Sequence, residues 1–124
     1  MPLGRPHHVV YDCPDPQRLG EFYSALLGLP ITYRSAEFVV VAASAQASGW
    51  AFQRVAGHRR PSWPGGDVPQ QVHLDVMVDD PDTARPAVLA VGAELLSADG
   101  HVYADPAGHP FCLIPRPSWA PPVG

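Results

Sequence analysis

The sequence contains few cationic residues and no long apolar run. Of its 124 residues only 8 are Lys or Arg, and its net charge is −4 at pH 7. This balance argues against a surface that neutralises nucleic-acid phosphates. No segment approaches the roughly 20 uninterrupted apolar residues that a membrane-spanning helix needs. We therefore expect neither a nucleic acid nor a membrane as a partner.

Cysteine is also scarce, because Cys13 and Cys112 are the only two in the chain. Two cysteines do not make a disulfide framework. The N-terminal residues Met1–Arg5 lack the apolar core of a signal peptide, which favours a cytoplasmic location. Hydrophobic residues make up 46% of the chain and charged residues 16%. This composition is typical of a globular domain with a buried core.

The most informative feature that is present is an internal repeat. His8 and the pair Asp15-Pro16 recur as His73 and the pair Asp80-Pro81, with the same spacing between histidine and aspartate. A glycine near the end of a helix-like segment and several strand-like runs follow each pair. Such a repeat predicts two copies of one supersecondary unit that pack against each other.

The repeat also sets the predicted domain organisation. We place the two modules at about 7–56 and 71–115, within one domain that spans residues 1–124. The stretch 57–70 between them is rich in Gly and Pro and is expected to be a linker.

The first module has clear helix boundaries. Asp15 is a typical N-cap, and Pro16 fits the first helical position because its missing N–H costs nothing there. Gly28 suits a left-handed C-cap. Strand-like runs precede and follow this helix, at His8–Cys13, Ile31–Arg34, Phe38–Ala43 and Trp50–Val55. The predicted order is therefore β-α-β-β-β.

The second module repeats this order. Asp80-Pro81 begins a helix that ends near Gly92, although Pro86 weakens its first turns. The turn signature Asp105–Gly108 predicts a hairpin between the last two strands. The four strand-like runs are Val72–Val78, Ala93–Leu96, His101–Ala104 and Pro110–Ile114.

The alternation along Val72–Val78 predicts which face of this strand is buried. Its apolar residues share one face, which we expect to pack beneath the helix, whereas His73 and Asp75 lie on the other. That second face should border water or a ligand. His101 would lie across from Cys112 if the hairpin loop has two residues, and a shift of one residue would turn His101 outward.

Several motifs occur together in the chain. They are His8-(x)6-Asp15-Pro16-(x)5-Phe22-Tyr23-(x)2-Leu26-Leu27-Gly28-Leu29, Trp50-Ala51-Phe52-Gln53, His73-(x)5-Asp79 and Asp105-Pro106-x-Gly108-x-x-Phe111-Cys112-Leu113-Ile114. With these motifs the chain resembles the vicinal oxygen chelate superfamily, the glyoxalase and bleomycin-resistance fold, from about His7 to Ile114. The resemblance implies an α+β fold in which two tandem βαβββ modules form a curled mixed sheet, a cup.

The resemblance also implies where a metal would bind. Metal-dependent members use one residue from the first strand and one from the last strand of each module, which here are His8, Gln53, His73 and Cys112. Relatives typically have a glutamate at the two last-strand positions, where this chain has Gln53 and Cys112. Because carboxylates offset the lost hydration of a divalent cation, their absence weakens such a site. We therefore expect no cofactor, and a zinc ion on a His₂Cys set is the alternative.

In proteins of this superfamily the two halves of the cup enclose the ligand. The residues expected to line that pocket are His8, Trp50, Gln53, His73, Asp75, His101 and Cys112. An imidazole titrates near neutral pH, so His8 and His73 are the candidates for a general base. Asp75 could instead orient the imidazole of His73, and for Trp50 a place in the core or the cup wall is favoured over specific recognition of the ligand.

Three functions are compatible with the sequence. The first is binding of a small molecule without the usual metal, with or without a reaction. The second is a metal-dependent lyase, isomerase or dioxygenase of the glyoxalase type. The third is sequestration of an antibiotic, as in bleomycin-resistance proteins. The resemblance further implies a homodimer, while the ligand and any exchange of modules between subunits stay open.

Overall fold

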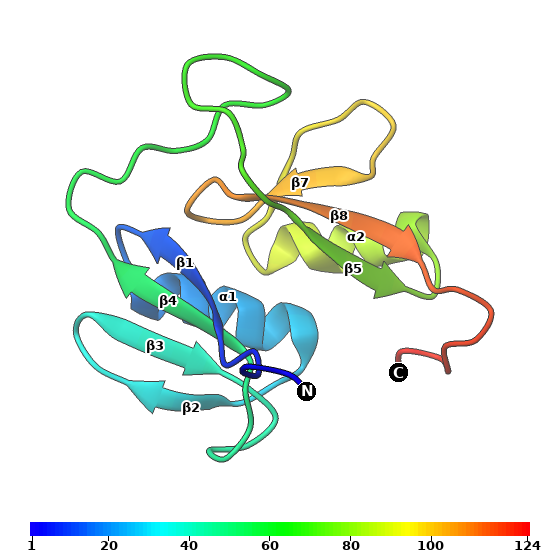
Figure 1. Ribbon diagram of the computed structural model, residues 1–124. Coiled ribbons are helices and arrows are strands. Elements are labelled where there is room, and N and C mark those ends of the chain that lie inside the picture. Colours follow the sequence, from blue (N-terminus) through cyan, green and yellow to red (C-terminus); the bar gives the residue numbers. More distant parts are fainter. The chain divides into compact units, whose positions relative to one another are not determined.

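The computed structural model describes residues 1–124, which form two compact units, Met1–His58 and Arg59–Gly124 (Figure 1). The boundary between them falls within the predicted linker 57–70. Each unit has one helix and four strands in the predicted order β-α-β-β-β. Each also has one four-stranded sheet, which does not close on itself. The predicted α+β class with two βαβββ modules is therefore confirmed, whereas their union in a single domain stays a prediction.

The first unit places the first and last strands of its module side by side. Its elements are β1 (Val9–Cys13), α1 (Pro16–Leu27), β2 (Ile31–Arg34), β3 (Phe38–Val41) and β4 (Trp50–Arg54). The sheet order is β1-β4-β3-β2. Strands β1 and β4 run parallel, and the other neighbours run antiparallel. The sheet is therefore mixed, and residues far apart in the sequence share one face.

Both helices begin at the predicted caps. In the first unit the side chain of Asp15 accepts a hydrogen bond from the N–H of Arg18, at 3.2 Å. In the second unit the side chain of Asp80 accepts one from the N–H of Asp82, at 3.0 Å. Helix α1 ends at Gly28, whose φ of 68° is the left-handed conformation expected of a C-cap glycine. Neither helix is long and apolar enough to cross a membrane.

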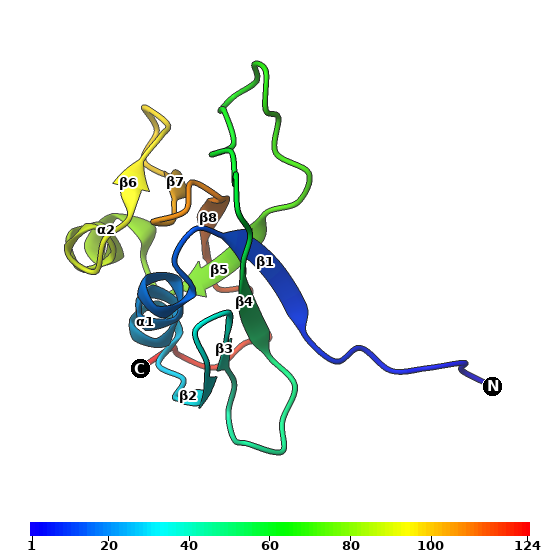
Figure 2. The same ribbon diagram turned by 90° about the vertical axis from the view of Figure 1, so that its left-hand side faces the viewer.

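An aromatic core joins the helix and the sheet of the first unit. Helix α1 lies against one face of the sheet (Figure 2) and buries Phe22 and Tyr23 there. The ring of Tyr23 stacks on that of Phe52, with ring centroids 5.2 Å apart. Gly20 allows this close approach, because a Cβ at Gly20 would lie 2.5 Å from Cγ1 of Val39. The helix therefore needs a glycine where it crosses β3.

The second unit has the same topology but buries less of its helix. Its elements are β5 (Leu74–Val78), α2 (Pro81–Ala90), β6 (Glu94–Leu95), β7 (Val102–Ala104) and β8 (Pro110–Pro115). The sheet order is β5-β8-β7-β6, and β5 runs parallel to β8. Val88 is the one buried residue of α2, which contains Pro86 in its interior. The two modules thus share a topology and differ in how many helix residues are buried.

The first strand of the second unit starts two residues later than predicted. Strand β5 begins at Leu74, so His73 precedes it, and Val72 is 68% exposed instead of packed beneath the helix. The physical reason lies in the partner strand, because β8 begins at Pro110. Proline has no N–H to donate, so the parallel ladder cannot extend to a residue paired with Pro110.

The turn between β7 and β8 decides the register of this hairpin. The N–H of Asp105 donates to the carbonyl of His109 at 2.9 Å, and the glycine of the turn has a φ of 91°. This is a loop with one more residue than the two-residue turn, with glycine in the left-handed position. As a result Val102 pairs with Cys112. Of the two registers compatible with the sequence, the structure has the one in which His101 does not face Cys112.

Replacing Gly20 by alanine should destabilise the protein. Alanine favours a helix over glycine by about 1 kcal/mol. The added methyl group, however, presses on the fully buried Val39, and overpacking of this kind costs about 1–3 kcal/mol. Chemical denaturation should therefore give Gly20→Ala a lower free energy of unfolding than the unaltered protein.

Gly65→Ala is the control for this comparison. Nothing lies within 4 Å of a Cβ placed on Gly65, so its stability should not fall. If Gly20→Ala were more stable than the unaltered protein by the full helix preference of about 1 kcal/mol, the close contact between α1 and β3 would be refuted.

Candidate functional site

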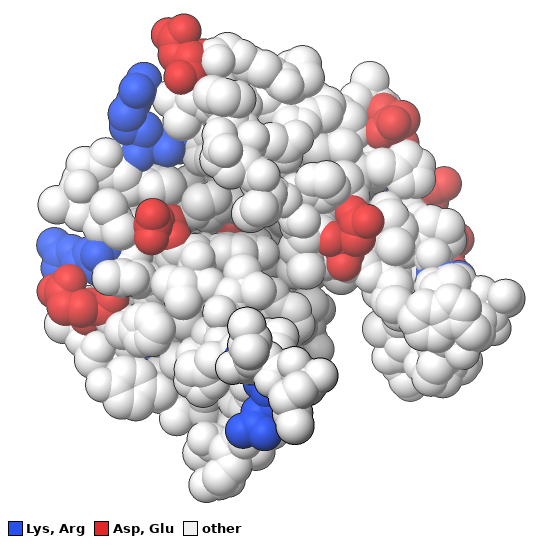
Figure 3. Space-filling model, viewed as in Figure 1, with Lys and Arg blue, Asp and Glu red and all other residues white.

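The predicted site residues fall into two groups, one in each unit. The first unit contains His8, Trp50 and Gln53, and the second contains His73, Asp75, His101 and Cys112. Charged side chains are scattered over the face shown in Figure 3, where they form no large patch of one sign. We therefore describe the candidate site residues of each unit separately.

The first unit contains an open cavity of about 860 Å³. Its apolar part consists of Val10, Phe38, Val40, Ala45 and Ala47, from β1, β3 and the loop before β4. The remaining lining is polar and consists of His7, His8, Thr32, Tyr33, Gln46 and Ser48. No Asp, Glu, Lys or Arg lines the cavity. Small-molecule sites in proteins commonly measure about 300–1,000 Å³, so the size suits a small organic ligand.

The loop 42–49 that borders this cavity is anchored by Gly49. A Cβ on Gly49 would overlap the carbonyl oxygen of Val41, so only glycine fits there. The N–H of Gly49 donates to Nδ1 of His8 at 3.0 Å, and its carbonyl accepts the N–H of Val9 at 3.1 Å. Ala47 packs on a cluster of small apolar residues of the sheet. The loop is therefore fixed both to the start of β1 and to the sheet.

The hydrogen bond from Gly49 also determines the tautomer of His8. A backbone N–H can only donate, so Nδ1 of the neutral imidazole is the acceptor and the proton is on Nε2. Burial lowers the pKa of His8, and the ring of His7, with its centroid 3.8 Å away, lowers it further. Nε2 of His8 has no hydrogen-bond partner within the protein. Neutral His8, which is one of the residues that line the cavity, therefore carries a free N–H donor.

The two family metal positions in the first unit do not fit a metal. A ring nitrogen that carries a proton has no lone pair for a cation, and the other nitrogen of His8 already accepts from Gly49. Gln53 is exposed and offers only a neutral amide. No carboxylate lines the cavity to offset the charge of the ion. His8 is a hydrogen-bond donor in this structure.

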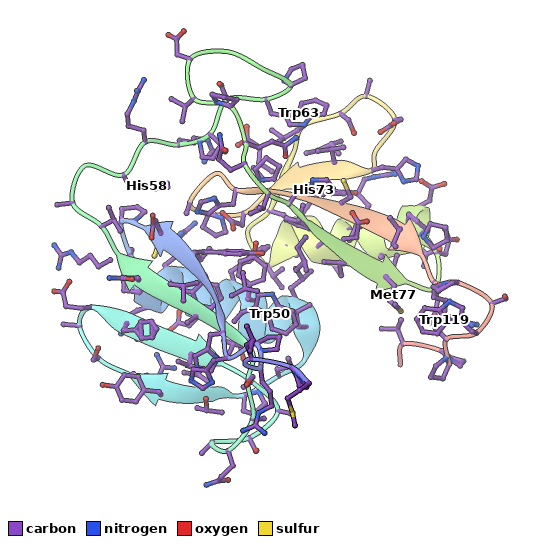
Figure 4. All side chains as sticks on the ribbon, viewed as in Figure 1. Trp50, His58, Trp63, His73, Met77 and Trp119 are labelled. Carbon is purple, nitrogen blue, oxygen red and sulfur yellow. The ribbon has the colours of Figure 1, made fainter.

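The second unit brings together three predicted residues. The ligand atoms of His73, Asp75 and Cys112 all lie within 4.8 Å of one another. Asp75 and Cys112 are paired across the parallel strands β5 and β8. His73 lies just before β5 (Figure 4), and its Nε2 is 3.4 Å from Oδ1 of Asp75. The first two residues are exposed and Cys112 is half-buried.

This group has the chemistry of a zinc site. An imidazole nitrogen, a carboxylate oxygen and a thiolate sulfur are all common zinc ligands. Asp75 supplies a negative charge to this group, whereas the two family metal positions of the first unit, His8 and Gln53, are neutral. Without a cation, burial raises the pKa of Cys112, and the carboxylates of Asp75 and Asp99 raise it further. The thiol is therefore protonated and a weak nucleophile until a cation replaces its proton.

The other predicted site residues lie outside the cavity and the three-residue group. Trp50 (Figure 4) is half-buried at the start of β4 and does not line the cavity. Nδ1 of His101 lies 3.4 Å from the carbonyl oxygen of Leu113. A role for Trp50 or His101 in binding stays a prediction.

Most of the cavity lining was not predicted from the sequence. Phe38 and Val40 alternate with Val39 and Val41, which are fully buried. This period of two places Phe38 and Val40 on the sheet face away from α1, so the strand pattern contained a usable signal. Ala47 had no such signal, because its position depends on the conformation of the loop.

Comparison with known proteins identifies the family. The chain matches the model of the glyoxalase-like domain over residues 8–114. The protein therefore belongs to the glyoxalase-like domain family of the vicinal oxygen chelate superfamily. No curated protein matches the chain.

Solved structures show the same fold at low sequence identity. A glyoxalase-related enzyme from Fulvimarina pelagi is 19% identical, with a TM-score of 0.64 over 95% of this chain and 92% of that one. A glyoxalase/bleomycin resistance protein/dioxygenase family enzyme from Burkholderia phytofirmans is 20% identical, with a TM-score of 0.64 over 86% and 94%. The fosfomycin resistance protein FosX from Mesorhizobium loti is 16% identical, with a TM-score of 0.63 over 95% and 96%. Likeness at these identities shows the fold alone.

The imidazole of His8 should titrate below pH 6.5, its ordinary value, because burial and His7 disfavour the charged ring. A histidine with a lowered pKa takes up its proton less readily in the folded than in the unfolded chain. Its contribution to stability is therefore present above pH 6.5 and is lost as the pH falls from 6.5 through the lower pKa of the folded protein. An NMR titration of the ring measures the midpoint directly.

The His8→Phe variant separates this effect from general acid denaturation. Its free energy of unfolding should fall less than that of the unaltered protein between pH 7 and pH 5. A midpoint for His8 at or above pH 6.5 would contradict the effects of burial and of His7 on this ring.

Proposed function

We propose that the protein binds a small organic molecule in the cavity of the first unit, without a metal at that place. The cavity itself is the observation that carries the proposal, since it has the volume of a ligand site and combines an apolar lining with an unused N–H donor on His8. Sites for small molecules typically have this combination of apolar walls and a few polar groups.

The tautomer of His8 bears on how a bound molecule is held. With the proton on Nε2 and Nδ1 accepting from Gly49, the ring donates a hydrogen bond and does not accept a proton from a ligand. We therefore propose that His8 orients the ligand and does not serve as the general base for which the sequence made it a candidate. His73, next to Asp75, is left as the candidate base in the second unit.

Sequestration of a cationic antibiotic fits this cavity poorly. Such a ligand needs carboxylates to compensate its charge, because burying an unpaired charge is costly. None of the residues that line the cavity is acidic. Binding of a small molecule is therefore the function that the site supports best, and any reaction would follow from that binding.

Filling the cavity should abolish binding. Ala47 lines the cavity and packs on the sheet, so Ala47→Trp places an indole where the ligand would lie. Ligand-observed NMR with a mixture of uncharged aromatic fragments should show saturation transfer to bound fragments in the unaltered protein and lose it in Ala47→Trp.

The matched control is Ala90→Trp, which adds the same side chain at an exposed position at the end of α2. This control should bind the fragments as the unaltered protein does. Equal binding by Ala47→Trp and Ala90→Trp, with both folded, would refute the cavity as the binding site.

A second candidate function is metal binding by His73, Asp75 and Cys112. The observation that favours it is the proximity of the three ligand atoms, all within 4.8 Å of one another. A zinc ion bound there would supply Lewis-acid chemistry, polarising a carbonyl or a water molecule. The chain's own part is to hold the ion with one nitrogen, one oxygen and one sulfur.

Zinc titration tests this second function. The protein should take up one ion per chain as measured by elemental analysis, and the uptake should raise the thermal unfolding temperature. Cobalt in place of zinc should give the near-ultraviolet absorption of a thiolate–metal bond, which Cys112→Ser removes.

His101→Ala is the control, because His101 is outside the three-residue group. It should bind the metal as the unaltered protein does. Failure of the unaltered protein to take up zinc or cobalt would remove metal binding as a function and leave the cavity of the first unit untouched.

A further inference from the structure

We infer that the ligand of the first unit's cavity is an uncharged molecule with an aromatic or branched apolar body and a hydrogen-bond acceptor, such as a ketone, ester or amide carbonyl. This inference rests on the proposed function and names the class of molecule that the cavity selects. Three separate observations support the inferred ligand class. They are the absence of charged side chains from the lining, the apolar surface of the cavity and the proton on Nε2 of His8.

The absence of Asp, Glu, Lys and Arg from the lining disfavours ionic ligands. The cavity is lined by neither acidic nor cationic side chains of the Asp, Glu, Lys or Arg types. The cations of the neighbouring strands are paired elsewhere, since Arg34 donates to Gln17 of α1 at 2.8 Å and Arg54 lies 3.9 Å from Glu37. An ionised ligand would lose its hydration without gaining a counter-charge.

The apolar surface of the cavity suits a flat or branched body. Phe38 contributes an aromatic ring and Val40 a branched side chain, and both pack in the cluster that Ala47 covers. Tyr33 adds a second aromatic ring at the lining and is 54% exposed in the protein alone. An aromatic ring of the ligand could gain contact with both rings, in the offset or edge-on arrangements that such rings prefer.

The proton on Nε2 of His8 defines the polar end of the ligand. This donor has no partner within the protein, and the reversed tautomer is excluded because Nδ1 accepts from Gly49. A donor that a ligand covers without accepting its hydrogen bond is costly, so the bound molecule must supply an acceptor. Ser48 is nearby but is engaged with Nδ1 of His7, at 3.4 Å.

Four naphthalene probes of one size test this selectivity at pH 8. These are 2-acetylnaphthalene, which is neutral and has a carbonyl acceptor; 2-isopropenylnaphthalene, which has the same shape and no acceptor; 2-naphthoate, an anion; and 2-(aminomethyl)naphthalene, a cation. Affinities are measured by protein-observed NMR titration, which also reports whether the residues of the cavity respond. The acetyl probe should bind about tenfold more tightly than the isopropenyl probe, as expected for one hydrogen bond.

The His8→Phe variant assigns this preference to the imidazole. It keeps an aromatic ring in place and removes the donor, so the ratio of the two neutral affinities should fall to about one. Because the ratio is taken within each protein, a general loss of affinity in the variant cancels. Phe38→Ala is the matched control, which should weaken both neutral probes and keep their ratio. Should His8→Phe not fold, the ratio in the unaltered protein still decides the question.

The outcomes distinguish a wrong ligand class from a wrong proposed function. If the anion or the cation bound as tightly as the acetyl probe, or if the two neutral probes bound equally, the cavity would be a binding site and the inferred ligand class would be wrong. If none of the four probes bound and the cavity residues did not respond, both the ligand class and the proposed function would be overturned.

Discussion

The hydrogen bond from the N–H of Gly49 to Nδ1 of His8 is the interaction on which the candidate site of the first unit depends. It joins the loop before β4 to the residue before β1, where the two strands begin their parallel pairing. The same bond consumes one ring nitrogen and places the proton on the other. A single contact thereby positions a wall of the cavity and sets the chemistry of its histidine.

The two modules share a topology and have diverged in chemistry. In the first, α1 buries several aromatic and aliphatic residues against the sheet, and the opposite face offers an apolar cavity. In the second, α2 buries only Val88 and contains Pro86. Asp75 of β5 and Cys112 of β8 form a polar group there with His73, which lies just before β5. Duplication explains why both modules have a histidine near the first strand. The local hydrogen bonds decide what each histidine can do.

Features that depend on local sequence were predictable, and features that depend on a partner segment were not. Helix starts at Asp15 and Asp80 follow from capping, which is decided within a few residues. The start of β5 depends on Pro110 in another strand, and the place of His101 depends on how many residues a turn contains. The cavity could not be predicted from the sequence, because the loop 42–49 forms part of its wall. Gly49 holds that loop through contacts with residues about 40 positions away, which no local pattern reveals.

Residue type at a family's ligand position does not determine whether that position binds a metal. His8 matches the type expected of a first-strand ligand, and yet its hydrogen bond with Gly49 leaves no lone pair for a cation. Asp75 matches no ligand position of the family, and yet its carboxylate lies with His73 and Cys112 in a group that could hold one. The two modules therefore differ in their capacity to bind a cation, because they differ in where protons and negative charges are located. By this criterion we propose a neutral hydrogen-bond acceptor as the ligand of the first unit and a cation as the ligand of the second.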